Sequence, residues 1–104
     1  MKVYNMKNPN GNKVANQFVI TDADSDRMTF QSYNSEIVTI DFQNHTITVG
    51  DDWDYSNTTG KYRNLFMRNS VGIMTNKDEF RKALEKGGCV DDHGTTWVVV
   101  QGTN

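Results

Sequence analysis

The most regular alternation of apolar and polar residues lies in the middle of the chain. Val38, Ile40 and Phe42 alternate with polar residues, and Ile47 and Val49 resume the alternation after a short polar break. Successive side chains of a strand point to opposite faces, so the pattern predicts a β-hairpin with one buried and one hydrated face. A one-residue slip would turn the apolar set outward, and we therefore expect a firmly set register.

Two further strands are predicted before this hairpin. Residues 8–12 collect residues that favour turns, and residues 17–20 combine aromatic and β-branched residues. The extended pattern resumes over residues 28–33, with Met28 and Phe30 on one side. We expect these two strands to pair across the acidic loop that separates them.

The spacing of apolar residues changes to a helical period after Trp53. Tyr62, Leu65 and Phe66 are spaced i, i+3, i+4 and predict a short helix over residues 59–68. A second helix is predicted to begin near residue 76, with Asn76 or Thr75 as its cap. The residues that give its capping box, apolar stripe and C-terminal end are Glu79, Phe80, Ala83, Leu84, Gly87 and Gly88.

The C-terminal part of the chain predicts two strands, Cys89-Val90 and residues 96–101, around a polar turn. Apolar residues occupy both faces of the second strand, because Val98 and Val100 lie on one face and Trp97 and Val99 lie on the other. We therefore expect the last strand to be covered on both faces.

At 104 residues the chain has the size of one domain. We assign residues 1–104 to a single α+β domain, a twisted antiparallel β-sheet with two short helices. A net charge of -2 argues against the broad basic face that duplex nucleic acid needs. The single Cys89 cannot form an internal disulfide, and no apolar run approaches the roughly 20 residues of a membrane helix. We expect a cytoplasmic protein that contacts no membrane.

Three carboxylates at alternate positions, Asp22, Asp24 and Asp26, match the first half of an EF-hand calcium loop. Arg27 stands where that loop needs glycine, and Tyr33 stands where it needs a bidentate glutamate. A hydrated loop explains the pattern better. We predict neither a bound metal nor any other cofactor.

Cys89 and His93 form the best candidate for a catalytic pair. A thiol nucleophile needs a base in contact with the sulfur and a third group that orients the base. These two residues flank a predicted tight turn without a supporting motif, and the chain has no phosphate-binding loop or serine elbow. We predict that the protein is not an enzyme, and a thiol enzyme stays as an alternative.

Aromatic, acidic and amide residues gather over residues 33–34 and 51–63. Tyr, Trp and Arg dominate binding hot spots because they bury large rigid areas and keep a polar group. Trp53 and Tyr62 fit the core equally well, since a small domain needs its aromatic rings inside. The predicted partner-binding residues are Tyr33, Asn34, Asp51, Asp52, Trp53, Asp54, Tyr55 and Arg63.

Three segments resemble a family of small uncharacterised proteins of bacteriophages and mobile elements. They carry the strings Asn-Gln-Phe, Phe-Gln-Ser-Tyr-Asn-Ser and Trp-Asp-Tyr-Ser-x-Thr-Thr-x-Lys-Tyr-Arg, within residues 8–18, 30–35 and 53–66. The resemblance covers residues 1–69. The helix and hairpin of residues 70–104 look like an addition.

The resemblance implies a partner in the bacterial host cell, namely a host protein, with a defence factor such as a CRISPR-Cas nuclease as the main candidate. Carboxylates on a rigid sheet imitate phosphates, so they can occupy the basic nucleic-acid channel of such a nuclease. An anti-CRISPR-type inhibitor would act in this way without catalysis. The carboxylates available for this mimicry are Asp22, Asp24, Asp26, Glu36, Asp51, Asp52 and Asp54.

A single-stranded nucleic-acid-binding protein is the main alternative function. Phe30, Tyr33 and Tyr55 would stack on bases, because every base offers a π-face. The residues expected to bind phosphates are Lys61, Arg63 and Arg68. A bacteriophage protein with a housekeeping role is a further alternative that the resemblance leaves open.

Overall fold

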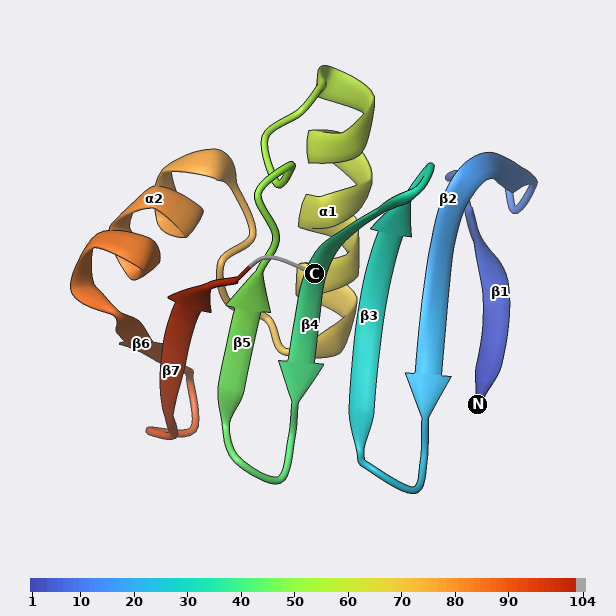
Figure 1. The fold of residues 1–104 in the computed structure, drawn as a ribbon. Coiled ribbons are helices and arrows are strands. Elements are labelled where there is room, and N and C mark those ends of the chain that lie inside the picture. Colours follow the sequence, from blue (N-terminus) through green and yellow to red (C-terminus); the bar gives the residue numbers. More distant parts are fainter. Residues whose placement is uncertain (103–104) are drawn as a thin grey trace.

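In the computed structural model, which describes residues 1–102, seven strands form one sheet and two helices pack against it (Figure 1). The strand order is β1-β2-β3-β4-β5-β7-β6. The predicted α+β class is confirmed. The strands are β1 Lys2–Lys7, β2 Lys13–Asp22, β3 Arg27–Ser32, β4 Ser35–Asp41, β5 Thr46–Val49, β6 Gly88–Val90 and β7 Thr96–Gln101, and the helices are α1 Asn57–Ser70 and α2 Lys77–Lys86.

The central hairpin of β4 and β5 has the predicted register. Val38 pairs with Val49, and Ile40 pairs with Ile47. All four side chains are buried. β2 and β3 also pair antiparallel across the acidic turn, as predicted. The alternation of apolar and polar residues predicts these pairs correctly, because the buried face of each strand fixes its register.

The sheet is mixed, because β5 and β7 pair in parallel whereas the other neighbouring strands are antiparallel. Both helices and β6 lie between β5 and β7 in the sequence. Parallel neighbours need a long crossover of this kind. The prediction of a wholly antiparallel sheet is therefore wrong at this pair, which also joins the C-terminal strand to the centre of the sheet.

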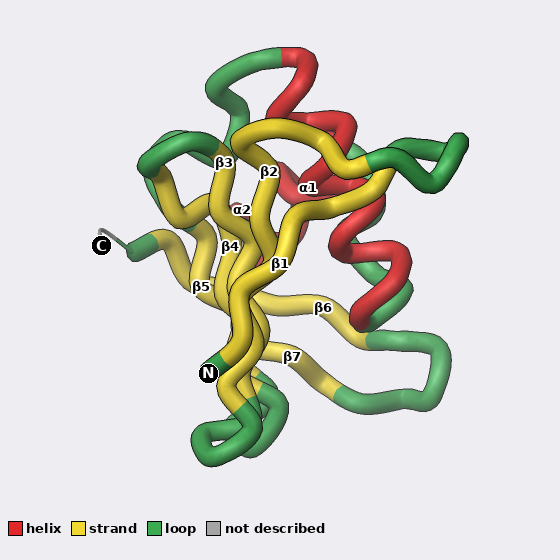
Figure 2. Tube along the Cα trace, turned by 90° about the vertical axis from the view of Figure 1, so that its right-hand side faces the viewer, coloured by secondary structure: helices red, strands yellow, loops and turns green. Residues whose placement is uncertain are grey.

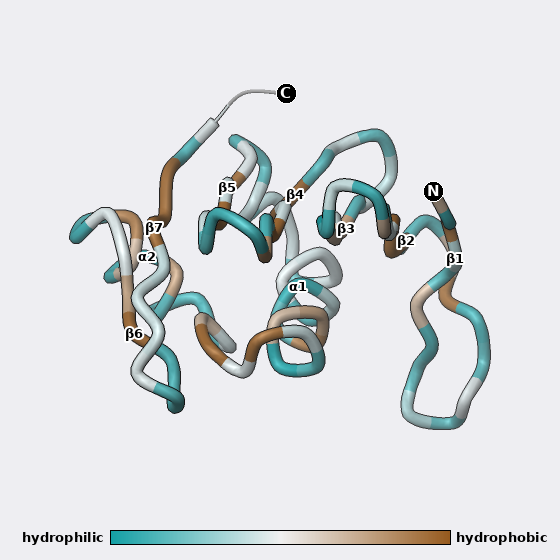
Figure 3. Tube along the Cα trace, turned by 90° about the horizontal axis from the view of Figure 1, so that it is seen from below, coloured by the Kyte–Doolittle hydropathy of each residue, from teal (hydrophilic) through white to brown (hydrophobic). Residues whose placement is uncertain are grey.

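α1 packs on one face of the sheet (Figure 2), and α2 lies on the same side, because its Phe80 contacts Arg63 of α1. Seen from below, α1 lies beneath the central strands and α2 lies beside β7 (Figure 3). Phe66 and Met67 of α1 and Phe80 of α2 are buried. The rings of Phe30 and Phe66 stack with centroids 5.9 Å apart. Burial of such side chains stabilises the fold by roughly 1.5–3 kcal/mol each, which holds the helices to the sheet.

The opposite face of the sheet stays open at β7. Val98 and Val100 are 49% and 43% exposed, whereas Trp97 and Val99 on the helix side are buried. The expectation that the last strand is covered on both faces is wrong. The physical reason is that both helices of the described residues 1–102 pack on one side.

Side-chain caps fix the start of each helix. Thr59 N donates to the Ser56 side chain at 3.1 Å, so α1 begins two residues before the predicted start. Glu79 N donates to Asn76 Oδ1 at 2.9 Å, as predicted, and the Glu79 carboxylate accepts from Thr75 N. The helices have 14 and 10 residues, and none within residues 1–102 is long and apolar enough to cross a membrane.

The turn between β6 and β7 is built around the carboxylate of Asp91. It accepts hydrogen bonds from His93 N, Thr95 N and Trp97 Nε1, at 2.9, 3.0 and 2.9 Å. The bond from Trp97 is the largest cause of a lowered pKa at Asp91, and the backbone bonds add to it. Asp91 therefore stabilises the turn in its ionised form.

Asp91→Asn is expected to weaken the acid sensitivity of the fold. The folded pKa of Asp91 lies below its ordinary value of 3.8, so its contribution is complete above that value and is lost as the pH falls through the folded pKa. As the pH is lowered from neutral to below 3.8, the urea concentration at the midpoint should decrease for the wild type and decrease less for the variant. The control is Asp92→Asn, and equal slopes for Asp91→Asn and the wild type would refute the role.

Candidate partner-binding site

Tyr33 occupies the tip of the β3–β4 hairpin in a backbone conformation that favours glycine. Ser32 pairs with Ser35, which leaves Tyr33 and Asn34 as a two-residue turn. Tyr33 has a φ of 56°, where a side chain costs about 1–2 kcal/mol. Its backbone N–H donates to Asn16 O at 2.7 Å, and the residue is 52% exposed. The hairpin thus holds an aromatic ring in solvent from a strained position.

A close backbone contact brings the loop after β5 against this hairpin. Gly50 N donates to Ile37 O at 2.8 Å. A Cβ at Gly50 would collide with the carbonyl oxygen of Glu36, so the position requires glycine. The loop continues to Asp52, whose Oδ2 accepts from Ser35 Oγ at 2.7 Å. These contacts hold the hairpin and the loop in one arrangement.

α1 begins at the end of this loop, and its first turn is tied to β3. Thr59 Oγ1 lies 2.9 Å from Ser32 Oγ, and both residues are buried. Tyr55 precedes the helix cap and is 72% exposed, and its N–H donates to Asp52 O at 3.1 Å. The β3–β4 turn and the start of α1 lie at the same end of the sheet (Figure 1).

The hairpin tip, the loop and the start of α1 line a cavity of about 660 Å³, which we call the tyrosine cavity. A smaller cavity of about 410 Å³ shares Asn34, Ser35 and Asp52 with it. Tyr33 and Tyr55 contribute the aromatic rings of the tyrosine cavity. Its other lining residues are Ser32, Asn34, Ser35, Ile37, Asp52, Ser56, Thr58 and Thr59.

Both cavities carry negative charge. Glu36, Asp51 and Asp52 line the smaller one, and Asp52 also lines the tyrosine cavity. Within residues 1–102, no lysine or arginine lines either cavity. Five of the eight predicted partner-binding residues therefore come together at one end of the sheet. We define the tyrosine surface by these five, Tyr33, Asn34, Asp51, Asp52 and Tyr55.

Arg63 does not belong to this surface, because its side chain is 2% exposed. The guanidinium lies 4.7 Å from the ring centroid of Phe80 and 5.3 Å from that of Trp53. It donates to Trp53 O at 2.7 Å and to Asn64 Oδ1 at 3.1 and 2.8 Å. Burial lowers the pKa of Arg63, and Asp54 opposes that shift. The prediction that Arg63 contacts a partner is wrong, because Arg63 ties the loop to the helices.

Trp53 and Asp54 also make contacts inside the chain. The Trp53 ring is half-buried and stacks on Phe80, with centroids 5.4 Å apart and an interplanar angle of 10°. Asp54 Oδ2 lies 2.9 Å from Lys77 Nζ, and Asp54 Oδ1 lies 3.9 Å from Arg63 Nη1. Neither Trp53 nor Asp54 lines the two cavities. They connect the loop to α1 and α2.

The structure removes two of the residues predicted to bind nucleic acid. Phe30 is completely buried in the core and Arg63 is almost completely buried, so neither reaches a base or a phosphate. Lys61 lies 5.4 Å from the ring of Tyr62, and neither Lys61 nor Arg68 lines the tyrosine cavity. The tyrosine surface lacks the adjacent cations that bind a phosphate backbone.

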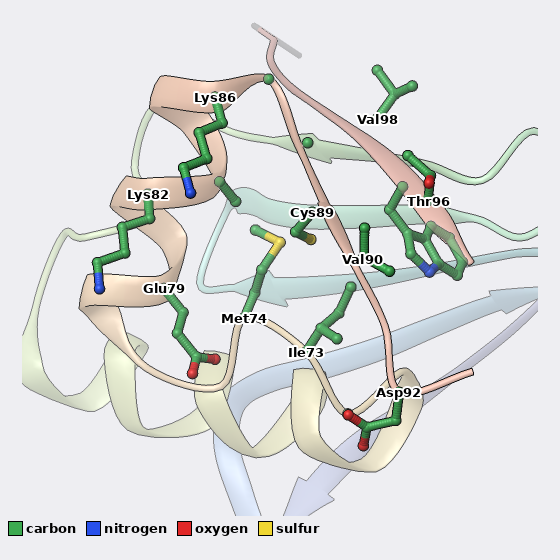
Figure 4. A pocket seen from close by; sticks show the side chains of 15 residues that line it. Ile73, Met74, Glu79, Lys82, Lys86, Cys89, Val90, Asp92, Thr96 and Val98 are labelled. Atoms are coloured by element: carbon green, nitrogen blue, oxygen red, sulfur yellow. The ribbon is translucent and has the colours of Figure 1, made fainter. Parts of the chain in front are cut away.

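Cys89 lies in a different groove, between α2 and the β6–β7 hairpin (Figure 4). This groove has a volume of about 760 Å³, and Figure 4 shows the Cys89 and Met74 side chains inside it. His93 is not among its lining residues. Burial, followed by the charges of Asp91 and Glu79, raises the pKa of the Cys89 thiol, which favours the unreactive protonated form. The groove therefore does not combine a thiolate with an imidazole.

No three His, Cys, Asp or Glu side chains within residues 1–102 are placed to hold a metal ion together. In the acidic loop, Asp22 Oδ1 accepts from Asp24 N at 3.2 Å and from Ser25 N at 3.4 Å. Hydrogen bonds from Ser25 are the largest cause of a lowered pKa at Asp22. The Asp22 carboxylate thus closes the turn between β2 and β3.

The sequence analysis missed the hydroxyl groups of the tyrosine cavity. Ser56, Thr58 and Thr59 directly precede or begin a helical period, which signals a cap. That signal does not reveal that Thr59 meets Ser32, because their contact depends on how α1 packs on β3. The two serines beside the Tyr33 turn gave no signal beyond the turn itself.

The model of DUF8033, a family of unknown function, matches residues 1–83. The chain therefore belongs to this family. The match includes every residue of the tyrosine surface and ends within α2. Neither the curated proteins nor the solved structures contain a match to this chain.

Proposed function

We propose that this member of DUF8033 is a non-enzymatic protein-binding module, which binds its partner through the tyrosine surface. The observation that carries the proposal is the pair of exposed tyrosines, Tyr33 and Tyr55, on one cavity that also presents the Asp52 carboxylate, with further carboxylates in the adjoining cavity. Exposed tyrosines bury large area at a small cost in side-chain entropy, and they are enriched in binding hot spots.

The tyrosine surface is held in shape before any partner binds. Asp52 is fixed by Ser35, and the first turn of α1 is fixed by the contact between Thr59 and Ser32. Preorganisation lowers the entropy lost on binding. The positive φ of Tyr33 agrees with a preformed surface, because such a conformation persists only where the surrounding structure holds it, here through the bond from Tyr33 N to Asn16 O.

The partner that fits this surface is a protein with a basic face. Glu36, Asp51 and Asp52 give a charge of one sign beside the rings, and complementary potentials favour a positive partner. The resemblance to bacteriophage proteins favours a host protein in the bacterial cytoplasm. A CRISPR-Cas nuclease suits the proposal, because its nucleic-acid channel is positively charged. Inhibition then follows from occupation of that channel, with no cofactor required.

Loss of both rings is expected to abolish partner capture without unfolding the protein. The double variant Tyr33→Gly/Tyr55→Ser removes the rings, and glycine at position 33 should raise the free energy of unfolding by about 1 kcal/mol because it relieves a positive φ. Tagged wild-type protein should recover a host protein from lysate, and the double variant should recover at least about 10-fold less. Mass spectrometry of the recovered material gives the measurement.

Tyr4→Thr is the matched control, because Tyr4 is 51% exposed but lies on the edge strand β1. It should recover the partner as well as the wild type does. Equal recovery by the wild type and the double variant would disprove the assignment of the surface. Recovery of single-stranded nucleic acid in place of protein, lost at high salt, would support the alternative function.

A further inference from the structure

We infer that the tyrosine cavity receives an arginine side chain of the partner protein. This inference rests on the proposed function and names the chemical group that anchors the partner. It follows from three properties of the cavity: its aromatic walls, its hydrogen-bond acceptors and its charge.

The aromatic walls suit a planar cation. Tyr33 and Tyr55 line the same cavity, and the two residues are 52% and 72% exposed. A guanidinium over the face of a tyrosine is attracted by the ring quadrupole and also stacks on it. The chain uses the same chemistry in its interior, where Arg63 lies over the rings of Trp53 and Phe80.

The polar lining supplies acceptors in the number that a guanidinium requires. An arginine presents five N–H donors and no acceptor. The Asp52 carboxylate accepts one bond from Ser35 at Oδ2, and a carboxylate has about four lone-pair sites. Asn34 and Thr58 add a carbonyl and a hydroxyl oxygen to the same lining. These groups favour arginine over lysine, whose ammonium is a compact point charge with three donors.

The negative charge of the site favours a bound cation, and no cationic side chain of the described residues lines the site. Glu36 and Asp51 extend the negative charge of Asp52 into the adjoining cavity. Within residues 1–102, no lysine or arginine lines the two cavities. Among the nearby cations, Lys77 pairs with Asp54, Arg63 is buried, and Lys61 lies over the Tyr62 ring. A partner therefore provides the missing positive charge.

The test is a titration of the protein with the blocked tripeptide acetyl-Gly-Arg-Gly-amide, followed by the NMR signals of the Tyr33 and Tyr55 rings. The comparison peptide carries citrulline, which has the same shape as arginine without the charge. We expect the arginine peptide to shift both rings with a Kd of about a few millimolar, and the citrulline peptide to bind at least about 5-fold more weakly. Asp52→Asn should weaken the arginine peptide at least about 3-fold. Asp24→Asn, on an exposed acidic turn distant in sequence, should leave the affinity for the arginine peptide unchanged.

Equal affinity for the two peptides, or no shift of the rings by the arginine peptide, overturns the inference. The inference is also overturned if the NMR signals of the two rings shift with a single-stranded oligonucleotide and not with the arginine peptide, which would identify nucleic acid as the occupant. It is likewise overturned if they shift only when the protein concentration is raised, which would identify a second copy of the chain. The proposed function fails separately. If Tyr33→Gly/Tyr55→Ser loses the captured partner while Asp52→Asn keeps it at full strength, the binding surface stands and the arginine anchor does not.

Discussion

Arg63→Ala is expected to lower the free energy of unfolding by about 3 kcal/mol, the largest loss from a single charged residue in this fold. The side chain is 2% exposed and lies over the rings of Trp53 and Phe80. Its removal leaves a cavity beside these two rings, which stack on each other with centroids 5.4 Å apart. It also leaves the Trp53 carbonyl and the Asn64 amide oxygen without their donors. Urea unfolding of the variant and the wild type gives the difference.

Two further variants separate packing from charge at this position. Arg68→Ala removes an exposed arginine from the same helix and should change stability by less than about 0.5 kcal/mol. Arg63→Lys keeps the charge but loses the planar fork, so it should recover less than half of the loss. A loss below about 1 kcal/mol for Arg63→Ala would contradict the structural role. In that case Arg63 would return to the set of partner-binding candidates.

Gly50→Ala is expected to destabilise the fold by about 3 kcal/mol and to weaken partner binding as well. A Cβ at this position collides with the Glu36 carbonyl oxygen, which is backbone and cannot move aside alone. Relief of the collision must separate Gly50 N from Ile37 O, which are 2.8 Å apart. The loop that carries Asp52 and Tyr55 then shifts away from the β3–β4 hairpin. Urea unfolding and partner capture measure the two effects.

Gly60→Ala is the matched control, with an expected effect of opposite sign. Gly60 lies inside α1, and a Cβ there would meet the Arg63 guanidinium at 3.6 Å, an ordinary contact. Alanine should therefore stabilise the helix by about 0.5–1 kcal/mol. If Gly50→Ala were as harmless as Gly60→Ala, the close approach of the loop to the hairpin would be refuted.

The parts of the fold that the sequence predicts are those where local spacing decides the structure. The alternation at Val38 and Ile40 predicts the central hairpin, and Asn76 with Glu79 predicts the start of α2. The parallel pair of β5 and β7 lies beyond such reasoning. The two paired strands are separated in the sequence by both helices, and no local pattern indicates which strand β7 pairs with.

The candidate site shows the same division between local and long-range information. Hot-spot composition identified Tyr33 and Tyr55, which are exposed, but it also selected Arg63, which is buried. The spacing contained a signal for that burial. Arg63 follows Tyr62 and precedes Phe66 by three positions, so it lies on the apolar face of α1. Hot-spot composition selects arginine by residue type, so it does not register the face of the helix on which Arg63 lies.

In the proposed complex a partner protein covers the tyrosine surface. Hydroxyl-radical footprinting of the protein, free and in the captured complex, tests it by comparing the oxidation rates of exposed tyrosines. Tyr33 and Tyr55 should lose most of their reactivity in the complex, while Tyr4, which is 51% exposed on the far edge strand, keeps its own. Unchanged oxidation of Tyr33 and Tyr55 together with protection of Tyr4 would contradict the account.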